Sequence, residues 1–259
     1  MVAIEIGLLF LLGLCFGSFI NCLVYRWNHQ VSIFKGRSFC PKCKKQINWY
    51  DNIPVISFVM LRGCCRRCHS PISWQYPIVE LTSAILTLII FNFSTYGGPT
   101  VGWQFLIFNL LLTYCLLAIF ISDLIYMTIP DEVVIFGVIV SLIFLISQYP
   151  NILISNLISA TGAGLFFYLL YLITKGKGMG MGDVKLALLT GLILGWPKIM
   201  IALYLAFLTG AIIGVILILI KRKKFGQVIP FGPFLALSTW ITMLFGDKIW
   251  LVFLNFFKG

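Results

Sequence analysis

The chain alternates long apolar runs with short polar connections, and this pattern predicts a polytopic membrane protein made of α-helices. A helix needs about 20 apolar residues to cross a bilayer, and most of the runs approach that length. The run Leu186–Leu194 is shorter and stops at Gly195-Trp196-Pro197, which indicates a tilted or partly embedded helix. Ile249–Phe257 is expected to be a separate short tail. The predicted spans, about eight in all, are Ile4–Tyr25, Ile78–Phe93, Trp103–Ile121, Val133–Leu145, Ile152–Ile173, Leu186–Leu194, Ile199–Ile220 and Pro230–Phe245.

The only long polar stretch of the chain, residues 27–75, separates the first two spans. We expect it to form a small extramembrane domain. The predicted organisation is therefore a first span at residues 1–26, a cysteine domain at residues 27–75 and an all-α polytopic core at residues 76–259.

The composition agrees with a membrane protein and changes the meaning of the charge. Hydrophobic residues make up 60% of the chain and charged residues 10%, whereas ordinary soluble domains carry about 25% charged residues. The formal net charge is +11, from 19 Lys and Arg against 8 Asp and Glu. On a soluble protein this excess would suggest a nucleic-acid partner. Here the cations gather at the ends of apolar runs, which indicates orientation in a membrane, and no nucleic-acid partner is expected.

The distribution of cations predicts which face of the membrane each loop occupies. Arg26 to Arg67 contains nine cations, and basic loops stay in the cytoplasm. The loop Ser94–Gly102 has no charge and is assigned to the outside, while Lys221–Lys224 is the strongest cytoplasmic stop. Alternation of the spans then places Asp123, Asp183 and the cysteine domain on the cytoplasmic side.

The polar domain carries a pattern typical of a structural zinc site. Its cysteines form C-x2-C-x21-C-x2-C, and two such pairs supply four thiolates to a tetrahedral ion. Two disulfides are the alternative, which a cytoplasmic location disfavours. Cys64 adds a fifth thiol that complicates the register, and Cys65 is preferred because it restores the x2 spacing. The predicted ligands of this zinc-ribbon-like site are Cys40, Cys43, Cys65 and Cys68.

Two carboxylates are the candidate catalytic groups, because ionisable residues at membrane depth are costly and usually functional. Asp123 ends an apolar run, and Asp183 follows three alternating glycines in Gly178–Lys185. If the two aspartates face each other, one can act as general base toward water and the other as general acid. The simpler alternatives are a helix cap for Asp183 and an interfacial carboxylate for Asp123.

The glycine loop and two further acidic residues carry predictions of their own. The alternating glycines are expected to permit unusual backbone angles and close substrate approach. Asp131, after Ile129-Pro130, is interpreted as a cap on the next helix. Glu80 lies near the cytoplasmic start of the second span, where it is either an interfacial anchor or a contact for substrate.

Taken together, these residues resemble the type IV prepilin leader peptidase/N-methyltransferases, polytopic aspartyl proteases of the GxGD type. The resemblance covers nearly the whole chain. A departure is Cys64, where the family more often has a basic residue. The blocks that carry the resemblance are Gly17–Asn21 with Tyr25 and Arg26, Cys40–Cys43, Trp49–Pro54 with Ser57, Leu61–Gly63, Cys65–Cys68, Tyr76–Glu80, Asp123 with Ile129–Asp131, Gly178–Lys185 and Ile229–Pro233.

The resemblance implies an activity, cofactors and a location. Asp123 and Asp183 match the catalytic pair, and the four cysteines match those of the family's cytoplasmic domain. The family cleaves the basic leader of prepilins or pseudopilins at the cytoplasmic face of the bacterial inner membrane, in pilus or secretion systems. It then methylates the new N-terminal residue with S-adenosylmethionine. No glycine-rich dinucleotide-binding motif is present, so the methyl donor is expected to bind the cysteine domain and adjacent loops, with Gly63 as a candidate contact.

Two alternatives stay open at this point. One is a peptidase that lacks methylation. The other, from a different class, is a transporter whose aspartates relay protons or cations. The cysteine domain argues against a transporter, as does the lack of paired broken helices in two halves.

Overall fold

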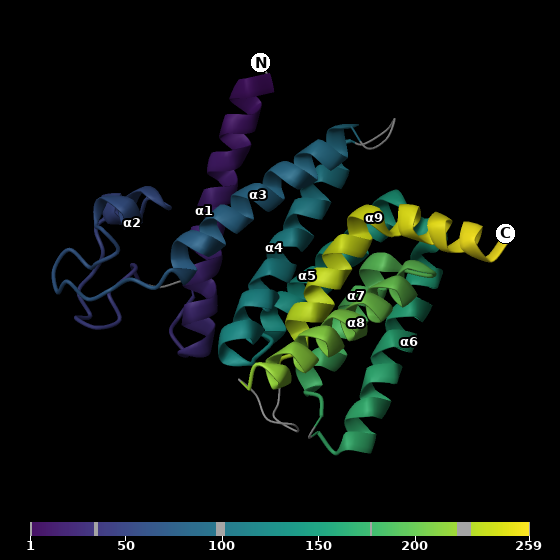
Figure 1. Cartoon of the computed structure of the whole chain (residues 1–259). Coiled ribbons are helices and arrows are strands. Elements are labelled where there is room, and N and C mark those ends of the chain that lie inside the picture. Colours follow the sequence, from purple (N-terminus) through teal and green to yellow (C-terminus); the bar gives the residue numbers. More distant parts are fainter. Residues whose placement is uncertain (1, 34–35, 97–101, 177, 222–228, 259) are drawn as a thin grey trace. The chain divides into compact units, whose positions relative to one another are not determined.

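The computed structural model describes residues 2–33, 36–96, 102–176, 178–221 and 229–258. Within these ranges the regular structure is helical, apart from two isolated β-bridges in the cysteine domain (Figure 1). The elements are α1 (Val2–Asn28), the 3-10 helix η1 (Trp49–Asn52), α2 (Ile56–Met60), α3 (Gln75–Tyr96), α4 (Trp103–Tyr126), α5 (Asp131–Gln148), α6 (Pro150–Thr174), α7 (Met181–Leu194), α8 (Lys198–Leu219) and α9 (Gly232–Lys258).

The prediction of an all-α polytopic membrane protein is confirmed. In the described part of the chain, 7 helices are long and apolar enough to cross a membrane. The remaining predicted span, Leu186–Leu194, corresponds to α7, which has only 14 residues and ends at Leu194 as expected. Its C-terminal cap is Gly195, whose φ of +64° suits a residue without a side chain.

The predicted break near the C-terminus is wrong. Pro230–Phe245 and Ile249–Phe257 were expected to be separate segments, but α9 runs from Gly232 to Lys258 without interruption. A glycine and two charged residues each cost a helix only about 1 kcal/mol or less, so they do not have to end it. Asp247 also pairs with Lys198 at the start of α8, with an Nζ–Oδ2 distance of 2.8 Å.

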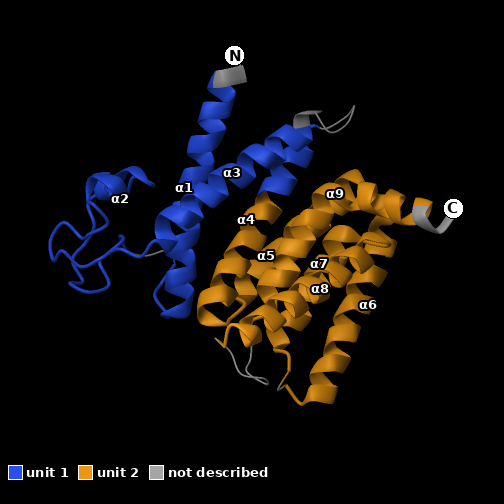
Figure 2. Ribbon diagram, viewed as in Figure 1, with its two compact units in different colours: residues 1–110 blue, residues 111–259 orange. Residues whose placement is uncertain are grey.

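Contacts divide the chain into two compact units, residues 1–110 and 111–259 (Figure 2). The first unit contains α1, the cysteine domain, α3 and the start of α4. The second contains the rest of α4 and the helices α5 to α9. The sequence features used for orientation lie partly outside the described residues, namely the centre of the uncharged loop at 97–101 and the basic stop at 222–224.

In the first unit, α1 and α3 cross at two glycines one helical turn apart. A Cβ at Gly13 would lie 2.5 Å from Cα of Ala84, and a Cβ at Gly17 would lie 2.6 Å from Cα of Glu80. Small residues at i and i+4 let two helix backbones approach closely inside a membrane. This crossing brings the start of α3 against the end of α1 that leads into the cysteine domain.

In the second unit, α7 is the central helix, and α5, α6, α8 and α9 all contact it. Leu186 and Leu189 are fully buried. Against α6 the backbones nearly touch, because a Cβ at Gly191 would lie 2.5 Å from the carbonyl oxygen of Ser159. Against α9, the hydroxyl of Thr190 is 3.0 Å from that of Thr239 in a buried hydrogen bond. The short helix is therefore fixed from several sides.

Candidate functional site

Asp123 lies one turn before the end of α4 and is buried, with 6% of its surface exposed. Its Oδ2 atom has no hydrogen-bond partner among the described residues. The first turn of α9 lies beside this atom, since a Cβ at Gly232 would lie only 2.6 Å from Oδ2. A buried, unpaired carboxylate oxygen is costly, and such groups in native proteins usually have a functional reason.

Asp183 lies in the first turn of α7 and is also buried, with 8% of its surface exposed. Its Oδ2 accepts a hydrogen bond from the N–H of Gly180 at 3.1 Å. The carbonyl oxygen of Gly180 accepts a hydrogen bond in return from the N–H of Asp183 at 3.2 Å. Asp183 therefore caps the helix from its third position, and this capping bond fixes the direction of the carboxylate.

The fold brings the two aspartates together in the second unit, close enough for their charges to interact. Ile129 fills the space beside them. A Cβ at Gly182 would lie 3.0 Å from Ile129, and a Cβ at Gly232 would lie 3.2 Å from the same side chain. Three segments far apart in the sequence thus meet around one isoleucine, and glycine at two of the contact points makes the approach possible.

The structure corrects one expectation about the glycine loop. None of Gly178, Gly180 and Gly182 has a positive φ, so the loop does not depend on unusual backbone angles. The positive φ in this region occurs at Gly176, at +72°. The requirement for glycine is instead steric at two of the positions, because a Cβ at Gly178 would lie 3.1 Å from Thr174 and the space beside Gly182 is taken by Ile129.

An ion pair joins the first turn of α5 to α7. Nζ of Lys185 donates to both carboxylate oxygens of Asp131 at 2.7 Å. The two side chains are 42% and 56% exposed, so the pair contributes only about 0 to 1 kcal/mol to stability. The interpretation of Asp131 as a helix cap is wrong, because Pro130 holds the N-cap position of α5 and no side-chain capping bond forms. Asp131 is the first residue of the helix, and its carboxylate pairs with Lys185 of α7 instead.

The arrangement of Asp123 and Asp183 suits acid–base chemistry on a neutral bond. Two neighbouring carboxylates resist simultaneous ionisation, so the pair can hold one proton between them. The charged member can then take a proton from water while the protonated member donates one.

The four predicted metal ligands form a cluster in the first unit. The sulfur atoms of Cys40, Cys43, Cys65 and Cys68 all lie within 4.8 Å of one another. The Sγ atoms of Cys40 and Cys68 are 3.8 Å apart, and a tetrahedral zinc ion bound at about 2.3 Å would set its sulfur ligands about 3.8 Å apart. The eight cysteines are free. The donor set therefore fits a zinc ion.

The two cysteine pairs have the same backbone fold, which places Cys65 rather than Cys64 in the cluster. The N–H of Cys40 donates to Lys45 at 3.0 Å, and the N–H of Cys65 donates to Ser70 at 2.9 Å. Each pair also closes with one β-bridge. Equivalent positions in the two pairs are 25 residues apart. Cys65 therefore corresponds to the ligand Cys40, whereas Cys64 corresponds to Phe39.

The hydroxyl of Ser70 prepares one ligand for metal binding. Oγ of Ser70 lies 3.2 Å from Sγ of Cys68. This side-chain hydrogen bond, with help from the backbone of Ser70, lowers the pKa of the Cys68 thiol to about 6. Cys68 is therefore mostly thiolate at neutral pH, which is the form that binds metal.

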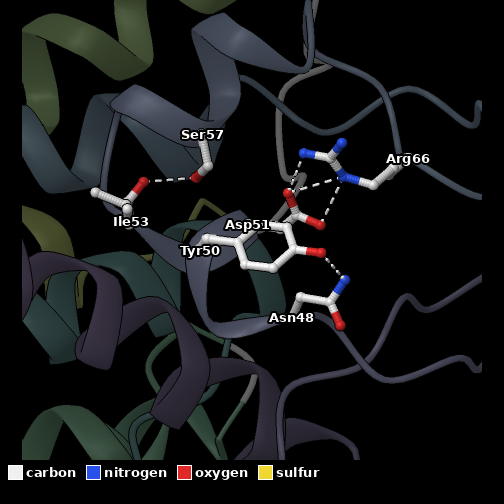
Figure 3. Close-up of polar contacts among 6 residues, drawn as sticks. All are labelled: Asn48, Tyr50, Asp51, Ile53, Ser57 and Arg66. Atoms are coloured by element: carbon white, nitrogen blue, oxygen red, sulfur yellow. Dashed lines mark hydrogen bonds and ion pairs between the residues drawn. The ribbon is translucent and has the colours of Figure 1, made fainter.

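A polar network ties the second cysteine pair to η1 (Figure 3). The guanidinium of Arg66 faces the carboxylate of Asp51, with Nη2–Oδ1 at 2.7 Å and Nε–Oδ2 at 2.9 Å. The same guanidinium lies 5.4 Å from the ring centre of Tyr50. Nδ2 of Asn48 donates to the hydroxyl of Tyr50 at 2.7 Å. The hydrogen bond to Asp51 raises the pKa of Arg66 further above its usual range.

Glu80 and Gly63 lie in the first unit. Glu80 is buried, and its Oε2 accepts a hydrogen bond from the N–H of Val55 at 2.7 Å. Gly63 has a φ of +69°, and its carbonyl oxygen accepts a hydrogen bond from Ile72 in the second cysteine pair. A Cβ there would lie 3.3 Å from the ring of Phe58. The backbone alone thus explains the glycine at position 63.

Residues of this site that the sequence did not single out are Gly232 and Ile129, whose contacts are long-range. Both occur in the short blocks on which the resemblance rests, but their contacts cannot be predicted from the neighbouring sequence.

Comparison with known proteins matches both parts of the chain. Residues 11–93 match the bacterial peptidase A24 N-terminal domain, and residues 110–215 match the type IV leader peptidase family. A protein of Aeromonas salmonicida is 35% identical, over 94% of this chain and 91% of its own length. A protein of Bacillus subtilis is 32% identical, over 94% of this chain and 96% of its own length. Both are named prepilin leader peptidase/N-methyltransferase. No solved structure gives a significant match.

Proposed function

The chain belongs to the type IV leader peptidase family, and we propose that it removes the leader peptide of type IV prepilins or pseudopilins with Asp123 and Asp183 as its catalytic pair. The observation that carries this proposal is the meeting of two buried carboxylates from α4 and α7, one of which has an unpaired oxygen. The enzyme is thus an aspartic endopeptidase as well as a membrane protein.

The reaction is hydrolysis of one peptide bond. The ionised aspartate removes a proton from water, whose oxygen attacks the carbonyl carbon. The protonated aspartate donates its proton to the amide nitrogen, and the carbon–nitrogen bond breaks. The products are the leader with a new carboxylate and the mature chain with a new amine.

The substrate explains why the active site belongs at a membrane face. A prepilin N-terminus is a basic leader followed by an apolar helix, so its scissile bond lies where the helix leaves the bilayer. We place Asp123, Asp183 and the cysteine domain at the cytoplasmic face of the bacterial inner membrane, because the basic residues from Arg26 to Arg67 favour that side. The core at residues 76–259 is the peptidase part in this proposal.

The second proposed activity is N-methylation of the new N-terminal residue. S-adenosylmethionine supplies a methyl group bound to a positively charged sulfur. The amine nitrogen forms a bond to that carbon, the carbon–sulfur bond breaks with its electron pair left on sulfur, and the amine releases one proton. Residues 27–75 are the proposed location of this step, since the domain lies beside the membrane on the proposed side of cleavage.

Product masses test both activities in one experiment. Membranes containing the protein are incubated with a prepilin and S-adenosylmethionine, and the products are measured by mass spectrometry. The expected result is loss of the leader followed by the gain of one methyl group. Cleavage without a methyl group at saturating donor would leave a peptidase alone, and an intact prepilin would overturn the proposal.

The cysteine cluster is proposed to hold a structural zinc ion. A domain of about 50 residues has too small a core to be stable without a cross-link or a metal. The ion would join two backbone segments that contribute two thiolates each, and it would release protons on binding because the ligands bind as thiolates.

Measuring the zinc content of variants distinguishes the four proposed ligands from the adjacent Cys64. Purified protein is expected to contain about one zinc per chain, and Cys65→Ser is expected to lose it because three thiolates hold the ion much less tightly. Cys64→Ser is the matched control, since Cys64 is adjacent but outside the cluster. Metal analysis of the three proteins decides, and loss of zinc from Cys64→Ser alone would reverse the register.

A further inference from the structure

The first unit contains a cavity of about 430 Å³ between the cytoplasmic end of α1, the cysteine domain and the start of α3. Small-molecule sites in proteins are clefts of about 300 to 1,000 Å³, mostly apolar and with a few placed polar groups. This cavity has both apolar and polar side chains in its wall. The aromatic side chains that line it are Tyr25, Phe39, Phe58 and Tyr76, and its polar lining includes Asn21 and Glu80.

Glu80 is the charge that this cavity leaves without a counter-ion. Only 6% of the residue is exposed, and no ion pair of Glu80 occurs among the described residues. Its hydrogen-bond partners are the N–H of Val55 at 2.7 Å and the side chain of Ser18. A carboxylate held this way in a poorly solvated wall is a strong site for a cationic ligand.

Two of the five cations that line the cavity, Arg26 and Arg66, are engaged by other partners. Arg26 donates hydrogen bonds to the carbonyl oxygens of Ser32, Ile33 and Gly36 at 2.8 to 3.1 Å. Arg66 is engaged by Asp51 and lies over Tyr50. These bonds fix the guanidinium groups in directions set by their partners, so Glu80 is available to a ligand.

The backbone at Val55 has a strained conformation, and a hydrogen bond to the carboxylate of Glu80 helps to hold it. Val55 has a φ of +60°, which is unusual for a β-branched residue. Its N–H points at Glu80. Strained residues of this kind persist only where the surroundings fix them, and they gather at ligand sites. The strain is a second observation that marks this side of the cavity.

We propose that this cavity binds S-adenosylmethionine, with its cationic end against Glu80 and its adenine ring against the aromatic wall. The assignment rests on the proposed methyl transfer. The donor carries a sulfonium and an ammonium group, which match the single unpaired carboxylate, and a flat ring, which matches the aromatic side chains. Gly63 does not line the cavity. It therefore acts on the site only indirectly, by allowing the backbone turn at the second cysteine pair.

Direct binding tests the assignment without any substrate. The protein in nanodiscs is titrated with S-adenosylmethionine, and the dissociation constant is measured calorimetrically. Glu80→Gln is expected to weaken binding roughly tenfold or more, because the neutral amide keeps the shape of the side chain but loses the charge-assisted contact with the cation. Glu132→Gln is the matched control, because Glu132 is an exposed acid in the other unit. Zinc content and elution profile show whether each variant is folded.

A thiol in the cavity wall gives an independent measurement. Cys22 lines the cavity, whereas Cys15 lies two turns earlier on α1 and does not. Alkylation of each cysteine is followed by peptide mass spectrometry with and without the donor. The donor is expected to slow alkylation of Cys22 several-fold and to leave Cys15 unchanged.

The outcomes separate this inference from the proposed function. Equal affinity in wild type and Glu80→Gln, with no protection of Cys22, overturns the assignment even if the enzyme methylates its product. A raised KM for the basic leader with unchanged donor affinity also overturns it, because Glu80 then binds substrate. A wild-type enzyme that neither binds the donor nor adds a methyl group overturns the transferase half as well.

Discussion

Replacing Asp183 or Asp123 by asparagine is expected to abolish prepilin cleavage, with a loss of about 1,000-fold or more in kcat. Acid–base groups contribute about 100- to 10,000-fold each, and the pair acts as a unit that neither member can replace. Asparagine keeps the shape of the side chain, and it can still accept the capping hydrogen bond from Gly180. The loss is therefore chemical, and it is measured as initial cleavage rate at saturating prepilin.

The control for this pair is Asp131→Asn. Asp131 belongs to the same loop region, but its side chain is 56% exposed and pairs only with an exposed lysine. Its removal is expected to change the cleavage rate by no more than a few-fold. Wild-type cleavage by Asp123→Asn or Asp183→Asn would remove that residue from the mechanism, whatever the behaviour of the control.

Gly191→Ala is expected to have the largest effect on stability. A Cβ at this position would lie 2.5 Å from the carbonyl oxygen of Ser159 and 2.6 Å from Cα of Ala160, so it meets backbone that cannot rotate away. The helices α6 and α7 must separate to accept it. Overpacking of this kind costs about 1 to 3 kcal/mol, and more where the backbone cannot yield. Thermal unfolding in detergent measures the loss.

Gly162→Ala provides the comparison on α6. A Cβ at Gly162 would meet nothing within 4 Å, and alanine is the better helix former. Its unfolding temperature is expected to equal or exceed that of the wild type. Since α7 carries Asp183, Gly191→Ala should also lose cleavage in proportion to the displacement of the helix. Equal unfolding temperatures for the two variants would show that the contact between α6 and α7 is looser than described.

The sequence was most informative where the local signal is strong. Apolar runs located the helices, and glycine followed by proline located the end of α7 at Leu194. The same reasoning failed at Gly246-Asp247-Lys248, because α9 continues through these polar residues. Asp247 pairs there with Lys198, and the local sequence does not show a contact between residues so far apart.

The candidate site was predictable in its charges and not in its packing. Asp123 and Asp183 were identifiable because so few acids occur in an apolar chain. Their surroundings were not, since Ile129, Gly182 and Gly232 come together only in three dimensions. The glycine loop is an example. Its composition suggested unusual backbone angles, whereas in the structure Gly178 and Gly182 are needed because neighbouring side chains leave little room for a Cβ.

Two signals were present in the sequence and become clear only with the fold. Gly13-x3-Gly17 is a common helix-crossing pattern in membranes, and here it places α1 against α3 at Glu80. The two cysteine pairs repeat at an offset of 25 residues. Their side chains differ at most positions, so the similarity lies in hydrogen bonds that a sequence does not display.

The shared wall between the cysteine cluster and the cavity has a thermodynamic consequence. Cys40, Cys43 and Cys65 belong to both. If the proposed zinc ion orders these residues, it also shapes the pocket proposed for the donor, and the free energies of metal and donor binding are then coupled. Such coupling is reciprocal: if the metal tightens donor binding by some factor, the donor tightens metal binding by the same factor. If both proposals hold, removing the metal is expected to weaken donor binding.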